Sequence, residues 1–96
     1  MFAVYEEPGP GWDTARPRRE QDGWDEHAAF MDALVEDGFV VLGGPLGEGR
    51  FVLLAVDSDD EAAVRARLAA DPWLVEGGVL QISRIEPWTI FLDGRT

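Results

Sequence analysis

The chain has 96 residues, of which 46% are hydrophobic and 28% are charged, a composition typical of a folded globular protein. This length fits one domain that spans residues 1–96. Nineteen acidic residues against eight basic ones give a formal charge of −11, which repels phosphate backbones and anionic lipid surfaces. We therefore expect that the protein has neither a nucleic acid nor a membrane as a partner.

The residue types that the sequence lacks exclude several classes of chemistry. All eight basic residues are arginines, so no lysine is available to form a Schiff base with a carbonyl substrate or with pyridoxal phosphate. The lack of cysteine excludes disulfides, thiol nucleophiles and thiolate zinc sites. The first residues do not resemble a signal peptide, and no apolar run has membrane-spanning length, so we expect a cytoplasmic protein.

A short strand is predicted at residues 2–6, and a proline- and glycine-rich stretch follows at residues 7–23. Loops longer than about 12–15 residues in a compact domain are usually functional lids or disordered segments. Arg16, Arg18 and Arg19 form a basic cluster inside this loop. Two interpretations stay open: the arginines are solvated or paired with acidic residues, or the loop is a lid that meets an anionic ligand.

Residues 24–37 have the periodicity of an amphipathic helix. Asp22 is the candidate cap at its start, and Gly38 suits the left-handed conformation just past its end. The apolar arc of this helix holds the only histidine of the chain. The arc consists of Trp24, His27, Ala28, Phe30, Met31, Leu34 and Val35.

Residues 39–42 and 51–56 are strand-like, and the glycine-rich stretch 43–49 between them predicts a hairpin. Neither strand alternates apolar with polar residues, so both faces of each strand need cover. The two predicted helices can cover one face. We expect that a second copy of the chain covers the other face, which would make the protein a homodimer.

Ser58 and Glu61 have the spacing of a capping box, which predicts a second helix that runs to about Ala70. Asp71 follows on the inner side of this helix, just before a proline ends it. Residues 79–85 then predict a last strand.

The predicted order βαββαβ matches a ferredoxin-like α+β sandwich, with an antiparallel sheet and two helices on one of its faces. An apolar segment at residues 87–92 follows the last strand, and we expect it to dock on the body of the protein or on a partner.

His27 and Asp71 are the two residues most suited to proton chemistry. The positive end of the helix dipole disfavours an imidazolium at His27, which keeps a neutral ring available as a base. Asp71 faces the negative end of the other helix, so it needs a partner that compensates its charge. The alternatives are a structural histidine in the core and an aspartate that merely stops a helix before proline.

Four further residues are candidates to line a pocket around this pair. Trp24 and Trp73 neighbour the two polar residues and suit the walls of a pocket for a flat or cyclic small molecule, although they are also ordinary core residues. Gly44 and Pro45 belong to the predicted hairpin, which lacks the lysine and the following helix of a phosphate-binding loop. Its backbone N–H groups are candidates to stabilise an oxyanion if they border the pocket.

Four segments, in this order and spacing, resemble the YCII-like (YciI-related) family over nearly the whole chain. The resemblance implies a ferredoxin-like protomer that pairs into a dimeric α+β barrel, with His27 and Asp71 in an active-site pocket. The segments are Trp24-Asp25-Glu26-His27-Ala28-Ala29-Phe30-Met31, Gly43-Gly44-Pro45-Leu46, Asp71-Pro72-Trp73 and Ile85-Glu86-Pro87-Trp88.

The resemblance does not fix a reaction. One characterised branch of the family is a dehydrochlorinase that acts on a chlorinated hydroxyquinol, and most members have no assigned reaction. Many relatives carry an arginine three residues before the histidine, where this chain has Trp24. A role of that arginine in anion binding transfers to this chain only if Arg16, Arg18 or Arg19 replaces it.

We expect a cofactor-free lyase or isomerase, dehydrochlorinase-like in its chemistry, that acts on a small cyclic or aromatic molecule. His27 would be its general base or acid, and Asp71 would orient the His27 ring or handle a second proton. The alternative is a non-catalytic dimeric module that binds a small ligand or has an accessory role. One histidine and no cysteine give too few ligands for a transition-metal site, so no metal is expected, and a carboxylate site for a hard cation stays open.

Overall fold

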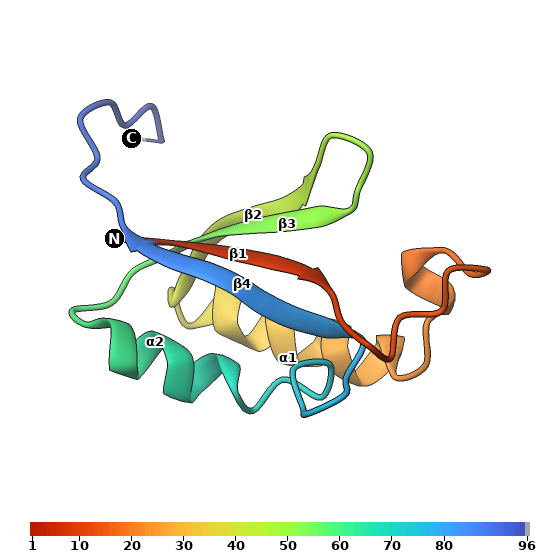
Figure 1. The fold of residues 1–96 in the computed structure, drawn as a ribbon. Coiled ribbons are helices and arrows are strands. Elements are labelled where there is room, and N and C mark those ends of the chain that lie inside the picture. Colours follow the sequence, from red (N-terminus) through yellow and green to blue (C-terminus); the bar gives the residue numbers. More distant parts are fainter. Residues whose placement is uncertain (96) are drawn as a thin grey trace.

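Strands and helices follow one another in the order that the sequence predicts (Figure 1). The computed structural model describes residues 1–95. Within these residues it contains a four-stranded antiparallel sheet and two α-helices, so the protein has a small α+β fold. The elements are β1 (Phe2–Pro8), the short 3-10 helix η1 (Arg18–Glu20), α1 (Trp24–Glu36), β2 (Val40–Leu46), β3 (Phe51–Val56), α2 (Glu61–Leu68) and β4 (Leu80–Pro87).

The strands lie in the order β2-β3-β1-β4, with antiparallel neighbours throughout the described sheet. Both helices lie on one face of this sheet (Figure 1). The arrangement is compatible with the predicted ferredoxin-like sandwich. The loop after β1 and the segment before β4 meet at one end of the sheet, where the N–H groups of Gly9 and Gly11 donate to the carbonyl oxygens of Val79 and Gly78.

The core lies between the sheet and the helices. Val4 of β1, Val56 of β3 and both Val64 and Leu68 of α2 are fully buried there. Because side chains alternate along a strand, the residues next to Val4 in β1 and next to Val56 in β3 point to the opposite face of the sheet. Val35, which the helical periodicity places in the inner arc of α1, is 53% exposed, so that part of the prediction was wrong.

The prediction of a loop over residues 43–49 was also wrong in extent. Strand β2 continues to Leu46, and Gly44 and Pro45 pair with Leu53 and Val52 of β3. Glycine and proline have the composition of a turn, but pairing with β3 supplies partners for the backbone and overrides that preference. Proline is tolerated here because β2 is an edge strand, where a missing N–H leaves no neighbour unpaired.

Both predicted helix caps differ from those observed. Gly23, with φ 76°, occupies the cap position of α1 and provides no side-chain hydrogen bond, so Asp22 is not the cap. At α2 the Asp60 carboxylate accepts the N–H of Ala63 at 2.7 Å, and Ser58 is not the cap. Asp60 lies one residue before the first helical residue, where its oxygen reaches that N–H directly.

The sheet face away from the helices carries exposed apolar side chains. Leu42 is 55% exposed, Leu46 43% and Phe51 39%. The tail after β4 leaves one end of the sheet on the side away from the helices (Figure 1), and Phe91 and Leu92 within it are almost fully exposed. The helices therefore cover one face of the sheet, as expected from hairpin strands that are apolar on both faces. That a second copy of the chain covers the other face stays a prediction.

Candidate functional site

The structure brings the side chains of His27 and Asp71 together. His27 Nδ1 lies 2.8 Å from Asp71 Oδ1 and 2.9 Å from Oδ2, across 44 residues of sequence. His27 lies near the start of α1, and Asp71 lies just past the end of α2. Asp71 is fully buried, and the His27 side chain keeps 10% of its surface exposed. The expected juxtaposition of an imidazole and a carboxyl group is therefore present.

Local backbone geometry fixes the direction of Asp71. Its own N–H donates to the carbonyl oxygen of Leu68, and its Oδ1 accepts the N–H of Trp73 at 2.9 Å. An aspartate that accepts from the residue two positions on closes an Asx turn, a common way for a helix to end before a proline. The carboxylate thus receives two donors, which compensate its position at the negative end of α2.

The pair also determines which ring nitrogen of His27 is available. An ionised carboxylate can only accept hydrogen bonds. Nδ1 of His27 therefore carries a hydrogen and donates it in the bond to Asp71. In the neutral ring, Nε2 then holds a lone pair. Among residues 1–95, no protein group bonds to Nε2. The arrangement can therefore present a base at Nε2, with Asp71 behind the ring.

Both Trp24 and Trp73 lie beside the His27 ring. The Trp73 indole stacks on the imidazole, with 4.0 Å between ring centroids and 8° between the planes. Trp24 lies 5.9 Å from the His27 ring and 5.6 Å from Trp73. Trp73 also donates from Nε1 to the carbonyl oxygen of Asp22 at 2.8 Å. This bond ties the start of α1 to the segment after α2.

Gly44 and Pro45, the other two predicted pocket residues, do not join this group. They line a hollow together with Leu42, Leu53 and Trp88 on the sheet face away from the helices. The cause is the extension of β2, which holds both residues in the strand instead of in a loop free to approach His27. The hairpin N–H groups were expected to stabilise an oxyanion only if they border the pocket around His27, and the hollow that Gly44 and Pro45 line does not include His27.

Glu6 is a residue of this region that the sequence analysis missed. It lies on β1, is 1% exposed, and its Oε2 has no hydrogen-bond partner among residues 1–95. Burial, together with the negative charge of Asp71, raises the pKa of Glu6 to about 7, and the positive charge of Arg18 opposes the rise. The available signal was its alternation with Phe2 and Val4, which places it on the buried face of the strand.

The three arginines of the long loop have different roles. Arg16 bonds to Asp13 at 2.9 Å and to Asp22 at 3.2 Å. Arg18 donates to the carbonyl oxygen of Gly49, at the tip of the β2–β3 hairpin. Arg19 lies over the Trp24 ring at 5.7 Å and forms no ion pair among residues 1–95.

The loop itself is organised around one buried side chain. The Gln21 amide donates to the carbonyl oxygens of Asp13 and Arg16 and accepts the N–H of Asp13. Gln21 is 3% exposed, so these hydrogen bonds form inside the loop, where water does not compete for them. The proline- and glycine-rich stretch is therefore internally braced, and it holds Arg18 and Arg19 close to the site.

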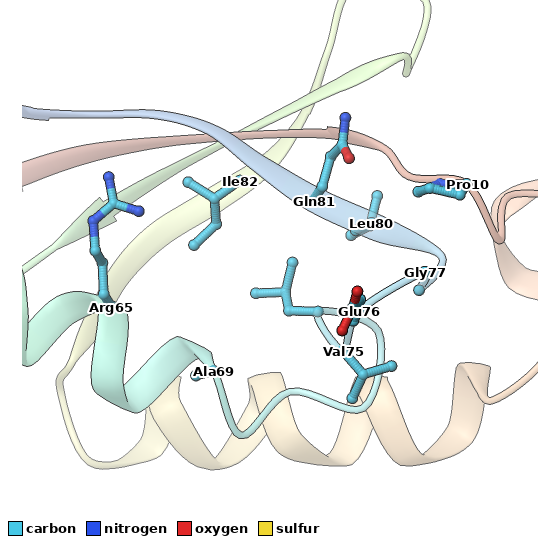
Figure 2. A pocket seen from close by; sticks show the side chains of 11 residues that line it. Pro10, Arg65, Ala69, Val75, Glu76, Gly77, Leu80, Gln81 and Ile82 are labelled. Carbon is cyan, nitrogen blue, oxygen red and sulfur yellow. The ribbon is translucent and has the colours of Figure 1, made fainter.

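A hollow of about 460 Å³ lies between α2 and β4, beside the turn that precedes β4 (Figure 2). Arg65, Gln81 and Ile82 line it, and neither His27 nor Asp71 does. This hollow and the His27–Asp71 pair are separate features. Within the part of the chain that the structure describes, no three or more His, Cys, Asp or Glu side chains are grouped to hold a metal ion, and no helix is long and apolar enough to cross a membrane.

A scan against protein-family models finds no matching family, and a search of the curated proteins finds no match. The chain is thus characterised by its fold and its site: a small α+β protein with a buried imidazole–carboxylate pair beside two tryptophans.

Proposed function

We propose that the protein is a cofactor-free lyase or isomerase that acts on a small cyclic or aromatic molecule. One observation carries the proposal: Asp71 holds Nδ1 of His27 at 2.8 Å and leaves Nε2 without a bond to any residue in the described range 1–95. This is the arrangement in which a carboxylate orients an imidazole as general base. We also propose membership of the YCII-like family, on the sequence segments given above.

The proposed reaction begins at Nε2 of His27. The ring accepts a proton from the bound molecule, and the Asp71 carboxylate stabilises the imidazolium that forms. Trp73 prevents the ring from rotating, because its indole stacks on one face of the imidazole. The same proton is then available for return to another atom of the molecule, or to a leaving group, so the cycle needs no cofactor.

The surroundings of His27 suit a flat and partly anionic molecule. Trp24 offers an aromatic surface, and its position is only partly buried. The guanidinium of Arg19 lies over this ring and is not neutralised by an ion pair within residues 1–95. Arg19 therefore suits the anion-binding role better than Arg16, which two aspartates already hold.

A dimer belongs to the same proposal. The exposed side chains Leu42, Leu46 and Phe51 lie on the sheet face that the helices leave open. Pairing of two such faces would bury apolar surface that a monomer leaves in water, and it would give the dimeric α+β barrel expected from the family resemblance.

The test uses the fact that the chain has a single histidine. Selective ¹⁵N labelling of histidine gives one imidazole spectrum, and small cyclic compounds, starting with a chlorinated hydroxyquinol, are screened for shifts of that spectrum. Compounds that shift it are then tested for conversion, with chloride release as one readout. His27→Gln is expected to reduce turnover by roughly 10²–10⁴-fold. Turnover that survives this substitution would reject the proposal.

The second candidate function is a non-catalytic small-ligand-binding or accessory module. The observation that favours it is that Asp71 also has a structural role. Its carboxylate accepts hydrogen bonds from the His27 ring and from the backbone N–H of Trp73. This candidate predicts that compounds bind beside His27 without conversion and that binding survives His27→Gln. Conversion that depends on His27 separates the two functions.

A further inference from the structure

We infer that Glu6 is a ligand-binding residue of the His27–Asp71 site and that its carboxyl group donates a hydrogen bond to an oxygen of the small molecule. The inference rests on the proposed function, and it narrows the class of ligand to molecules that present a hydroxyl or carbonyl oxygen. Glu6 lies on β1, and neither the fold nor the His27–Asp71 pair requires a carboxyl group there.

The first support is the burial of Glu6 without a bond. Its side chain is 1% exposed, and Oε2 is the one buried side-chain oxygen or nitrogen within residues 1–95 that lacks a hydrogen-bond partner. A buried polar group without a partner destabilises a protein by about 1–3 kcal/mol. Unsatisfied buried polar groups are rare in native proteins, so the free oxygen of Glu6 calls for a functional explanation.

The second support is the position of Glu6 among charged neighbours. Pro8, two residues after Glu6 on β1, pairs with Leu80, whose N–H donates to the carbonyl oxygen of Trp73, so Glu6 lies near the segment that carries Asp71. The charges of Asp71 and Arg18 both act on its carboxyl group. Its partners across β3 and β4 are Val52 and Ile82, which carry no charge. The charged groups that act on Glu6 therefore come from the long loop and from the segment after α2, and the second of these also holds Asp71 and Trp73 against the His27 ring.

The third support is that Arg18 forms no ion pair, within the part of the chain that the structure describes, that would keep the Glu6 carboxyl group ionised. The Arg18 guanidinium donates to the carbonyl oxygen of Gly49 and lies over the Trp12 ring at 5.2 Å. No ion pair joins it to Glu6 within residues 1–95. Burial and the charge of Asp71 raise the pKa of Glu6 to about 7, so a large fraction of the group is neutral at neutral pH and can donate.

The first experiment needs no ligand. The ¹³Cδ signals of a glutamate-labelled protein are assigned through the backbone and titrated. We expect the Glu6 signal to titrate near pH 7 and its midpoint to fall in Asp71→Asn, because that substitution removes a negative charge. Titration of Glu6 at the ordinary glutamate value, 4.5, would overturn the inference.

The second experiment uses resorcinol, a flat molecule with two hydroxyl groups, as the probe. Its binding is followed by both the Glu6 ¹³Cδ signal and the His27 ring signals between pH 5.5 and 8. We expect resorcinol to shift both residues and to bind more weakly as the pH rises through about 7, as Glu6 loses its proton. Glu6→Gln should bind with no such pH dependence, because an amide donates at every pH. Glu6→Leu should lose roughly tenfold in affinity.

Glu7 provides the matched control. It is the next residue of the same strand, points to the other face, and accepts a hydrogen bond from Gln81 at 2.9 Å. Glu7→Gln should bind resorcinol as the natural chain does, with the same pH dependence. Shifts of His27 without any change at Glu6 would reject the role of Glu6 and leave the proposed function standing. Shifts at neither residue would remove both.

Discussion

The imidazole of His27 and the indole of Trp73 lie parallel, with 4.0 Å between ring centroids. The Asp71 carboxylate hydrogen-bonds to Nδ1 of the His27 ring and also accepts a hydrogen bond from the backbone N–H of Trp73. The three residues therefore form one unit, in which a single carboxylate fixes the tautomer of the base and the direction of the aromatic wall. Four experiments test the consequences of this arrangement and of its surroundings.

Asp71→Asn should destabilise the protein by about 1–3 kcal/mol, because one amide oxygen must replace two carboxylate oxygens for buried donors. The ring of His27 should also lose its fixed Nδ1–H tautomer. Urea denaturation and the ¹⁵N spectrum of the labelled histidine measure the two effects. Asp25→Asn on the exposed side of α1 is the control, and it should change neither. An unchanged stability and spectrum in Asp71→Asn would contradict the geometry.

Trp73→Phe should keep an aromatic ring beside His27 but lose the hydrogen bond from Nε1 to the carbonyl oxygen of Asp22. We expect a loss of about 1 kcal/mol in the free energy of unfolding. Trp73→Ala should lose about 3–5 kcal/mol, because it also leaves a cavity where a side chain that is 1% exposed had packed. Equal losses of unfolding free energy in the two variants would show that the hydrogen bond of Trp73, and not the packing of its ring, stabilises the protein.

Stability should fall as the pH rises from about 4.5 to about 7, because Glu6 binds its proton more tightly in the folded protein than in the unfolded chain. The loss should reach about 3.5 kcal/mol at most, since each tenfold difference in proton affinity corresponds to about 1.4 kcal/mol. Denaturation measured across this pH range tests the sign and size. Glu6→Gln should flatten this part of the curve and Glu7→Gln should not. A rise in stability over the window would contradict the prediction.

Phe51→Glu, alone or with Leu42→Glu, should convert a dimer into a monomer, because it places charge on the apolar sheet face. Light scattering at micromolar concentration should give twice the chain mass of 10.6 kDa for the natural protein and the single mass for the variants. A natural chain of 10.6 kDa under these conditions would reject the dimer.

Hydrophobic periodicity was enough to predict the order of the elements and the inward direction of His27 and Asp71. Val64 and Leu68 repeat at helical spacing, and both are fully buried. The ends of elements were harder to predict, because neighbouring polar residues compete for one position. Ser58 and Asp60 both suit a helix cap, and only the three-dimensional path of the chain selects Asp60.

The burial of Glu6 shows where a local pattern becomes insufficient. A charged residue near the end of a strand is normally taken as the point where the chain meets water. Glu6 is buried because the 9–23 loop and the segment after α2 close over the end of β1, and those contacts are distant in sequence. The same holds for Gly44 and Pro45, whose turn-like composition gives way to pairing with β3.

The bond from Arg18 to the carbonyl oxygen of Gly49 joins the loop to the hairpin tip across 31 residues. The place of this guanidinium, whose positive charge opposes protonation of Glu6, therefore depends on a hairpin that lies far away in the sequence.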